Sequence, residues 1–573
     1  MAAIDLTSGS ASAYGSGELQ LQGKVQMTST LTLVTDNLNV ASPLLLSTDS
    51  VTNRGLANEV GSTAYGTTAL RSTTTGIDNT AVGYSALNAV ADGSSNTGVG
   101  HEVLILTTSG SHNTAVGKHA NRFNTTGTGN TGIGSLALRL NSTGTGNTAL
   151  GYLAMENNTN SNNTALGYRS LRANTSGTQN VAVGVDALLS NSTGSSNVAV
   201  GYQALNSNTA TGNTAVGFEA VLSNTSSTEI TAVGYQALKF STGGFNTAVG
   251  HAALRSTTTG ASNTALGRFA LTNNTTGNNN TAVGLNSLFT GSGSANTALG
   301  HSALNANTAS NNVAVGFEAA YTNTSGTGIT AIGYQALRSN TIGLSNTGVG
   351  YQSLYSTTTG NQNVALGQEA LYFNQLGSNN VAIGNYALRA NTAASNTAVG
   401  YDAARGNTSG TGITAIGYQA LTASTGNNNT ALGFQAGVAN TTATDNTLLG
   451  YQAGNNITTG SQSVVIGASA APLSATNSAA VIIGQAASGG FADVVIGRSS
   501  TGGTSSTVLG NSASAGLYTG CVVLGRSATA TANNQFVVGS ASVNAGTVVV
   551  GANVSSQYWN VIINGTAYKI LLA

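Results

Sequence analysis

The feature that most constrains this chain is a glycine that returns every 16 or 17 residues over most of its length. From Gly83 to Gly467, each such glycine closes a motif like NTAVG, and a segment like YQAL follows it. Between Gly467 and Gly551 the steps shorten to 12–17 residues. Helical hairpins and propeller blades need roughly 34 to 45 residues per repeat. The period therefore indicates one coil of a β-solenoid, with two short walls and two turns.

A single coil of this size is not stable alone. Each coil buries about two large apolar side chains, which are worth roughly 1.5–3 kcal/mol each. Ordering its backbone costs on the order of 1–2 kcal/mol per residue. Only stacked neighbours supply the missing hydrogen bonds and burial. We therefore predict an all-β fold, an elongated parallel β-solenoid of the left-handed β-roll type.

The NTAVG motif alternates in size. In the 22 units closing at Gly83 through Gly433, the residue before the glycine is Val, Leu or Ile, and the residue two before it is Ala or Gly. Alternate residues of a strand point to opposite faces. We expect the large residue, such as Val82, to fill the coil, and the small residue, such as Ala81, to face outward. An outward position restricted to small residues indicates a close partner chain, so we expect a homotrimer.

A polar column is also encoded in the repeat. Asn stands four residues before the glycine in 19 of those 22 units, and the exceptions are Ile230, Ile329 and Ile413. Stacked asparagines can form an amide ladder. The members we predict first are Asn79, Asn96, Asn113, Asn130, Asn147, Asn180 and Asn197. Leu recurs four residues after the glycine and marks the second wall, for which a short strand and a helical turn both remain open.

Four regions follow from these patterns. Residues 1–60 lie outside the repeat, and we interpret them as a base or attachment segment; Leu19, Leu21, Leu31 and Leu33 alternate there with polar residues, as in a strand. Residues 61–467 form the long-coil shaft, and residues 468–550 form a short-coil section. Residues 551–573 form a C-terminal cap or tip.

Composition excludes several function classes. The 17 basic and 17 acidic residues cancel, and charged residues make up 6% of the chain. Binding to nucleic acid needs a basic surface, so we expect none. The chain has one cysteine, five scattered histidines and no paired pattern of Asp and Glu. We therefore expect no catalytic residues, no cofactor-binding residues and no metal site, and we expect that the chain is not an enzyme. Without an 18-residue apolar run, we expect no membrane insertion.

The repeat resembles known fibres. The short units NSAAVIIGQAA and TSSTVLGNSASA resemble the head repeats of trimeric autotransporter adhesins. The long NTAVGYQAL units resemble the repeat shafts of bacteriophage tail fibres, as does the ending NGTAYKILLA. This resemblance covers roughly residues 61–573 and implies a homotrimeric fibre. We recognise no membrane-anchor barrel, coiled-coil stalk or secretory signal peptide, which favours the phage fibre.

These observations predict a structural fibre protein, most of all a phage virion (tail) fibre that mediates attachment to the host surface. The expected location is the virion or an extracellular surface. Expected partners are two further copies of the chain, other virion proteins through the N-terminal segment, and host surface polysaccharide or protein. A bacterial cell-surface adhesin or extracellular fibre is the alternative. An ice-binding β-solenoid is a remote one, because the strand Thr is often replaced by Val.

Aromatic residues suggest two contact surfaces. A Tyr or Phe often follows the repeat glycine, as in Tyr84 and Tyr202, and forms an interrupted column. Such a column either packs between chains or offers ring faces to sugars. Near the C-terminus, Tyr558, Trp559 and Asn560 lie together. They either close the last coil or form a receptor-binding tip, where aromatic side chains supply much contact energy.

Overall fold

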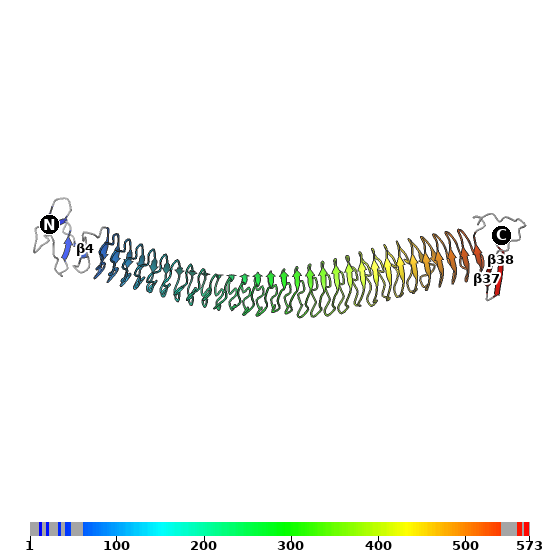
Figure 1. Cartoon of the computed structure of the whole chain (residues 1–573), viewed down its shortest axis with the longest axis horizontal. Coiled ribbons are helices and arrows are strands. Elements are labelled where there is room, and N and C mark those ends of the chain that lie inside the picture. The colour runs from blue at the N-terminus through cyan, green and yellow to red at the C-terminus, as the bar shows by residue number, and fades with distance from the viewer. Residues whose placement is uncertain are drawn as a thin grey trace. The chain divides into compact units, whose positions relative to one another are not determined.

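The computed structural model describes residues 61–539 in full, together with four short strands before them and two after them. The chain divides into two compact units, Met1–Asn312 and Val313–Ala573. The described residues form strands and turns and contain no helix. The predicted all-β fold is confirmed: the repeat builds a parallel β-solenoid, described below one unit at a time (Figure 1).

Each long coil contributes one strand of three residues to a parallel ladder. In the first unit these strands are β5 (Thr63–Tyr65), β6 (Thr80–Val82), β7 (Thr97–Val99), β8 (Thr114–Val116), β9 (Thr131–Ile133), β10 (Thr148–Leu150), β11 (Thr164–Leu166), β12 (Val181–Val183), β13 (Val198–Val200), β14 (Thr214–Val216), β15 (Thr231–Val233), β16 (Thr247–Val249), β17 (Thr264–Leu266), β18 (Thr281–Val283) and β19 (Thr297–Leu299). The pairing keeps equivalent positions opposite one another: Ala149 pairs with Ala165, and Leu150 with Leu166. Like residues therefore form columns along the stack.

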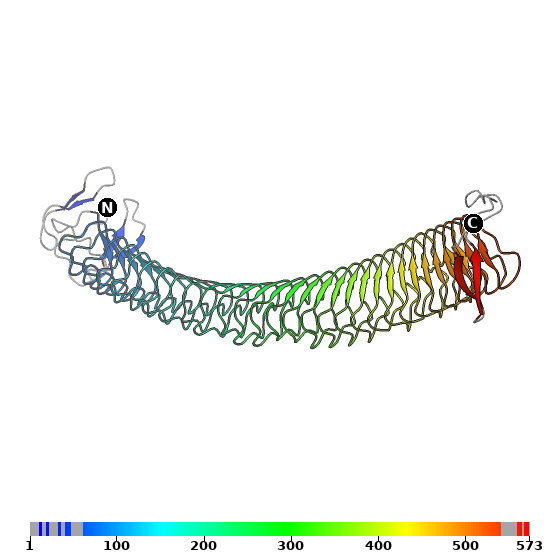
Figure 2. The same ribbon diagram turned by 45° about the vertical axis from the view of Figure 1, so that its right-hand side comes forward.

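The second unit shows the same pattern of three-residue strands. Its strands are β20 (Val313–Val315), β21 (Thr330–Ile332), β22 (Thr347–Val349), β23 (Val364–Leu366), β24 (Val381–Ile383), β25 (Thr397–Val399), β26 (Thr414–Ile416), β27 (Thr430–Leu432), β28 (Thr447–Leu449), β29 (Val464–Ile466), β31 (Val481–Ile483), β33 (Val494–Ile496), β34 (Thr507–Leu509), β35 (Val522–Leu524) and β36 (Phe536–Val538). Within each unit the strands form one wall, and the turns form the other (Figure 2).

The strand faces are reversed relative to the prediction from size. The small central residue is fully buried, as at Ala81 and Ala149, and the large residue beside the glycine lies outside, with Leu150 43% exposed. The reason is the width of the coil. A Cβ added at Gly98, in a central position, would lie 3.1 Å from Val103 and 3.2 Å from Leu87. Leucines of the second wall already fill the interior, so the inferred outward Ala face, and with it the argument for a trimer, is wrong.

The second wall is neither a strand nor a helical turn in the long coils. It is a series of turns in which the second and fourth residues after the glycine adopt left-handed backbone angles, such as Gln203 (φ 52°) and Leu205 (φ 51°). Left-handed Leu is unfavourable by itself. Neighbouring coils compensate: the Gln203 N–H donates to the Val185 carbonyl at 2.9 Å, and the Leu205 N–H donates to the Ala220 carbonyl at 3.0 Å.

The repeat glycine is required by its backbone. Gly201 has a φ of 136°, and a Cβ at this position would lie 2.4 Å from the carbonyl oxygen of Gly217 in the next coil. Both the backbone angle and the close stacking exclude a side chain. The glycine column therefore fixes the corner between the strand and the second wall.

Near the end of the long coils, the large and small core residues exchange places between the two walls. Leu448 takes the central strand position, where the preceding coils carry Ala or Gly, while Gly437 and Gly454 take the second-wall positions of Leu. A Cβ on Gly437 would lie 2.5 Å from Leu448, and one on Gly454 would lie 2.7 Å from it. The total side-chain volume in the core is thus conserved: the strand wall carries the large residue here, and the second wall carries the small one.

This exchange introduces the short-coil section. From β29 to β35 the central strand residue is large and buried, as at Val465, Ile482 and Val495. The second wall now gains strands of its own, because β30 (Ala471–Pro472) pairs in parallel with β32 (Ser488–Gly489). In this section both walls therefore carry parallel pairing, which the second wall continues through bridges from Ser488 to Thr501 and from Thr501 to Ser514.

Short antiparallel pairs lie at the two chain ends. β1 (Ala11–Ala13) pairs with β2 (Leu19–Leu21), and β3 (Thr32–Thr35) pairs with β4 (Ala41–Leu46). β37 (Tyr558–Ile563) pairs with β38 (Thr566–Leu571). The predicted attachment role of residues 1–60 concerns side chains outside the described residues.

Candidate functional site

The predicted asparagines lie in a fully buried column beside the strand ladder. The Asn96 amide donates to Asn79 Oδ1 at 3.1 Å, and the same oxygen accepts the Asn96 backbone N–H at 3.0 Å. Each amide also reaches a turn carbonyl, as from Asn79 to Gly93 at 2.9 Å. The same column holds Asn113, Asn130, Asn147, Asn180 and Asn197. Its contacts are internal, so the column holds coils together and offers nothing to a ligand.

A second buried asparagine column was not predicted. It lies seven residues after the glycine, at the start of the NTTG or NSTG turn, as at Asn208 and Asn224. The Asn224 amide donates to Asn208 Oδ1 at 2.8 Å, and Asn213 of the first column donates to the same oxygen at 2.9 Å. The sequence signal for this column is the Asn that recurs three residues after the second-wall position of Leu.

Outside the coil, aromatic rings stack on each other along the axis. In the first unit Phe218 lies between Tyr202 and Tyr235, with ring centroids 5.1 Å apart on each side. In the second unit Tyr418 and Phe434 stack at 5.0 Å and 7°. Both faces of such interior rings are covered by neighbours in the same chain. Face-to-face stacking on sugar rings is therefore blocked there, and the column presents ring edges.

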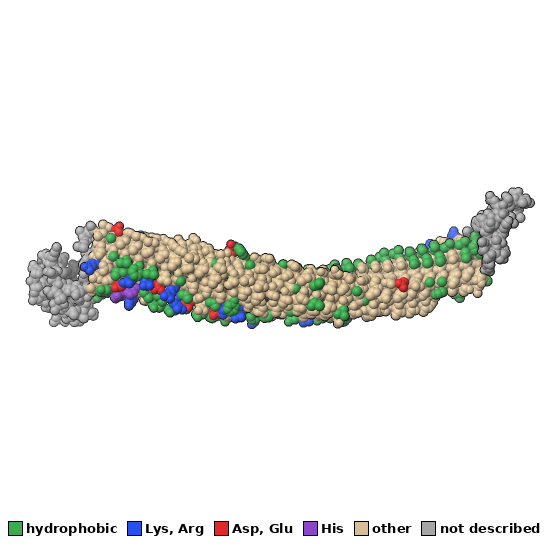
Figure 3. All heavy atoms as spheres, turned by 60° about the horizontal axis from the view of Figure 1, so that its bottom comes forward, with side chains coloured by type: hydrophobic (Ala, Val, Ile, Leu, Met, Phe, Trp, Pro, Cys, Tyr) green, Lys and Arg blue, Asp and Glu red, His purple; other side chains and the backbone are tan. Residues whose placement is uncertain are grey.

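An aliphatic column runs on the strand side of the same glycines. It consists of the Val, Leu or Ile that ends each strand; in the second unit Ile332 is 38% exposed and Leu366 is 47% exposed. Hydrophobic side chains follow one edge of this unit in Figure 3. Outward strand positions thus carry Thr or Val together with Val, Leu or Ile. The Thr-x-Thr array that ice binding requires does not occur on the strand ladders β5–β19 and β20–β36.

Charged residues form acid–base pairs along the second wall, which the sequence analysis did not predict. An acid two residues after the glycine contacts a base 20 residues later in the next coil. The pairs are Glu102–Arg122 at 2.8 Å, Glu219–Lys239 at 2.6 Å, Glu318–Arg338 at 2.7 Å and Glu369–Arg389 at 2.6 Å. The hydrogen bond from Lys239 holds the pKa of Glu219 below its ordinary value. An acid-to-base spacing of 20 residues was the missed signal.

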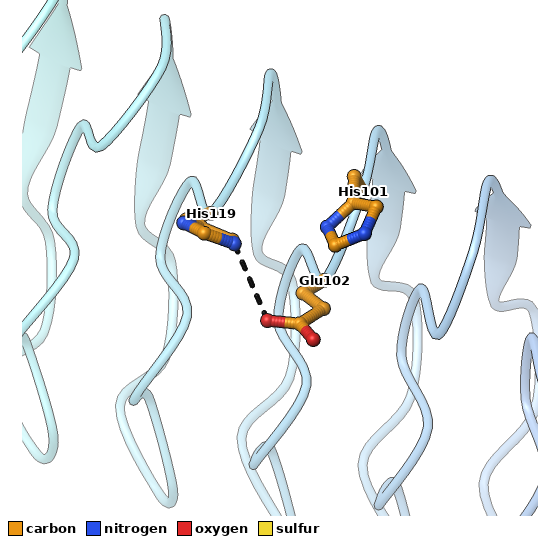
Figure 4. A group of neighbouring side chains, drawn as sticks. All are labelled: His101, Glu102 and His119. Atoms are coloured by element: carbon orange, nitrogen blue, oxygen red, sulfur yellow. Dashed lines mark ion pairs between the residues drawn. The ribbon is translucent and has the colours of Figure 1, made fainter.

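Among the residues that the structure describes, one cluster has the chemistry of a metal site. His101 and Glu102 lie on one coil and His119 on the next, and one potential ligand atom of each lies within 4.8 Å of the others. Figure 4 shows the His119 ring directed toward Glu102, with Nε2 and Oε2 3.3 Å apart. Burial and the nearby Arg122 lower the pKa of His119. The sequence suggested scattered histidines; the coil period brings these two together.

The predicted tip residues Tyr558, Trp559 and Asn560 form the start of β37, opposite Leu571, Ile570 and Lys569 of β38. Their side chains lie outside the described residues, so both interpretations, cap and receptor-binding tip, stay predictions.

No described segment forms a helix that is long and apolar enough to cross a membrane. A scan against protein-family models finds no match, and a search of curated proteins finds no significant match.

Proposed function

We propose that this chain is a structural fibre protein, most of all a phage virion (tail) fibre that mediates attachment to the host surface. The observation that carries the proposal is the in-register stack within each unit. Equivalent residues pair from coil to coil, as Ala149 with Ala165, and buried amide columns join the coils. Such a stack makes each unit long and stiff. It also presents the same exposed side chains at every coil, so that a partner can make the same contact repeatedly along the axis.

The exposed columns support self-association. Aliphatic side chains and aromatic ring edges run side by side in each unit, on either side of the glycine column. Exposed apolar side chains of this kind mark protein contacts when they form continuous patches. We propose that these columns, instead of the Ala face, pack between the chains of a homotrimer, and that residues 1–60 join it to other virion proteins.

Immunogold electron microscopy tests the location. Antibody raised against the repeat coils should label fibres on virions from the source culture. Label confined to bacterial surfaces would contradict the phage fibre and favour the adhesin. Thermal hysteresis measured in the purified protein would instead support ice binding. We expect none, because the outward strand positions alternate Thr or Val with Val, Leu or Ile.

A further inference from the structure

We propose that His101, Glu102 and His119 bind a divalent transition-metal ion of the zinc class, which bridges two successive coils. Two imidazole nitrogens and one carboxylate oxygen are ligand types that Zn²⁺ takes in proteins. One atom from each residue lies within 4.8 Å of the others before any ion is bound. The site would leave a coordination position open to water or to a ligand from a partner.

The geometry needs a small adjustment. Bonds of about 2.0–2.2 Å in a tetrahedral site place ligand atoms about 3.3 Å apart. His119 Nε2 and Glu102 Oε2 already have that separation, 3.3 Å. His101 is exposed; its ring stacks on Tyr84 at 5.0 Å on one side and meets the His119 ring edge-on at 5.6 Å on the other. A rotation of this exposed ring toward His119 and Glu102 would complete the set of ligands.

Arg122 is the competitor for this site. Its guanidinium lies 2.8 Å from the same Glu102 oxygen, and a bound cation would repel it. The ring of Phe123, 5.0 Å from the guanidinium carbon, offers Arg122 a place to remain once Glu102 has turned to the ion. Removing the Arg122 charge should therefore strengthen metal binding.

His251 provides a matched control. It occupies the same coil position as His101, directly after a repeat glycine, and it also stacks on a tyrosine, Tyr235, at 5.0 Å. The next residue is Ala252 instead of an acid, and the following coil carries Phe269 where His119 stands in the cluster. A histidine in this position without the other two ligands should not hold the ion.

The test is titration calorimetry of the full chain with Zn²⁺, supported by visible absorption after titration with Co²⁺. We expect one site whose affinity falls at least about 10-fold in His119→Ala and in Glu102→Gln, stays unchanged in His251→Ala, and rises in Arg122→Met. Equal affinity in wild type and His119→Ala would overturn the proposal, as would an equal loss in His251→Ala. Unchanged circular dichroism without metal separates loss of a ligand from loss of fold.

Discussion

Buried asparagines in the described coils make at least one side-chain hydrogen bond within the stack, as Asn124, Asn191 and Asn440 do. Asn121 departs from this rule: it takes the second-wall position of Leu, is fully buried, and neither its amide nitrogen nor its oxygen has a hydrogen-bond partner. Leu104 and Leu138 take the same position in the two adjacent coils. A buried amide without partners costs about 1–3 kcal/mol.

Asn121→Leu should therefore stabilise the first unit by about 1–3 kcal/mol. Calorimetry would show a higher melting temperature. Asn124→Leu is the control, because Asn124 is equally buried but donates to the Gly127 carbonyl at 3.1 Å. Asn124→Leu should destabilise the unit, because it removes this hydrogen bond. If both variants were more stable than the wild type, the added apolar volume alone would explain the gain in stability, and the unpaired amide of Asn121 would not.

The Glu219–Lys239 pair gives a pH dependence. Because the pKa of Glu219 is lowered in the folded state, its contribution to stability is present above the unfolded value, about 4.3, and is lost as pH falls through the folded value. The pair is partly exposed, so the effect should stay within about 1 kcal/mol. Glu219→Gln should flatten the loss of stability between pH 5 and pH 3 relative to wild type. Identical pH profiles would contradict this.

At the scale of the element, each coil is a balance of volume between its two walls. The repeat period, the strand positions and the alternation of faces are predictable from sequence, because each follows from spacing alone. The sequence alone does not predict which face of the strand lies inside the coil. Val82 is the larger residue and was expected to be buried, but the leucine four residues after each glycine competes for the same narrow interior.

The proximity of His101 and His119 was also not predicted from the sequence. Residues that lie 18 positions apart become neighbours only when the coils stack.

Ala182→Leu tests the assignment of faces. The added volume should meet Leu171 and Leu188 across the core and cost about 1–3 kcal/mol by overpacking. Adding Leu171→Gly and Leu188→Gly reproduces the natural exchange around Leu448 and should recover part of the loss, measured as the melting temperature. Unchanged stability in the single variant would show that Ala182 faces outward and not into the core.

For the whole molecule, the proposed trimer depends on the outer columns. Native mass spectrometry of the full chain should give three times the chain mass of 56.6 kDa. Ile332→Glu with Leu366→Glu, which places charge in the aliphatic column of the second unit, should shift the population to single chains without changing the circular dichroism. A monomer mass for the unaltered chain would contradict the trimer.

Distances between spin labels along the first unit would show whether its coils are stacked one strand spacing apart. With Cys521 replaced by Ala, cysteines at the exposed strand residue Thr148 and at Thr231, Thr264 or Thr281 lie five, seven and eight coils apart. Labelled chains are diluted with unlabelled chains, so that pulsed electron paramagnetic resonance reports distances within one chain. At a strand spacing of about 4.8 Å, the separations should be about 24, 34 and 38 Å, rising linearly with coil number. Distances that do not rise by one strand spacing per coil would contradict the solenoid.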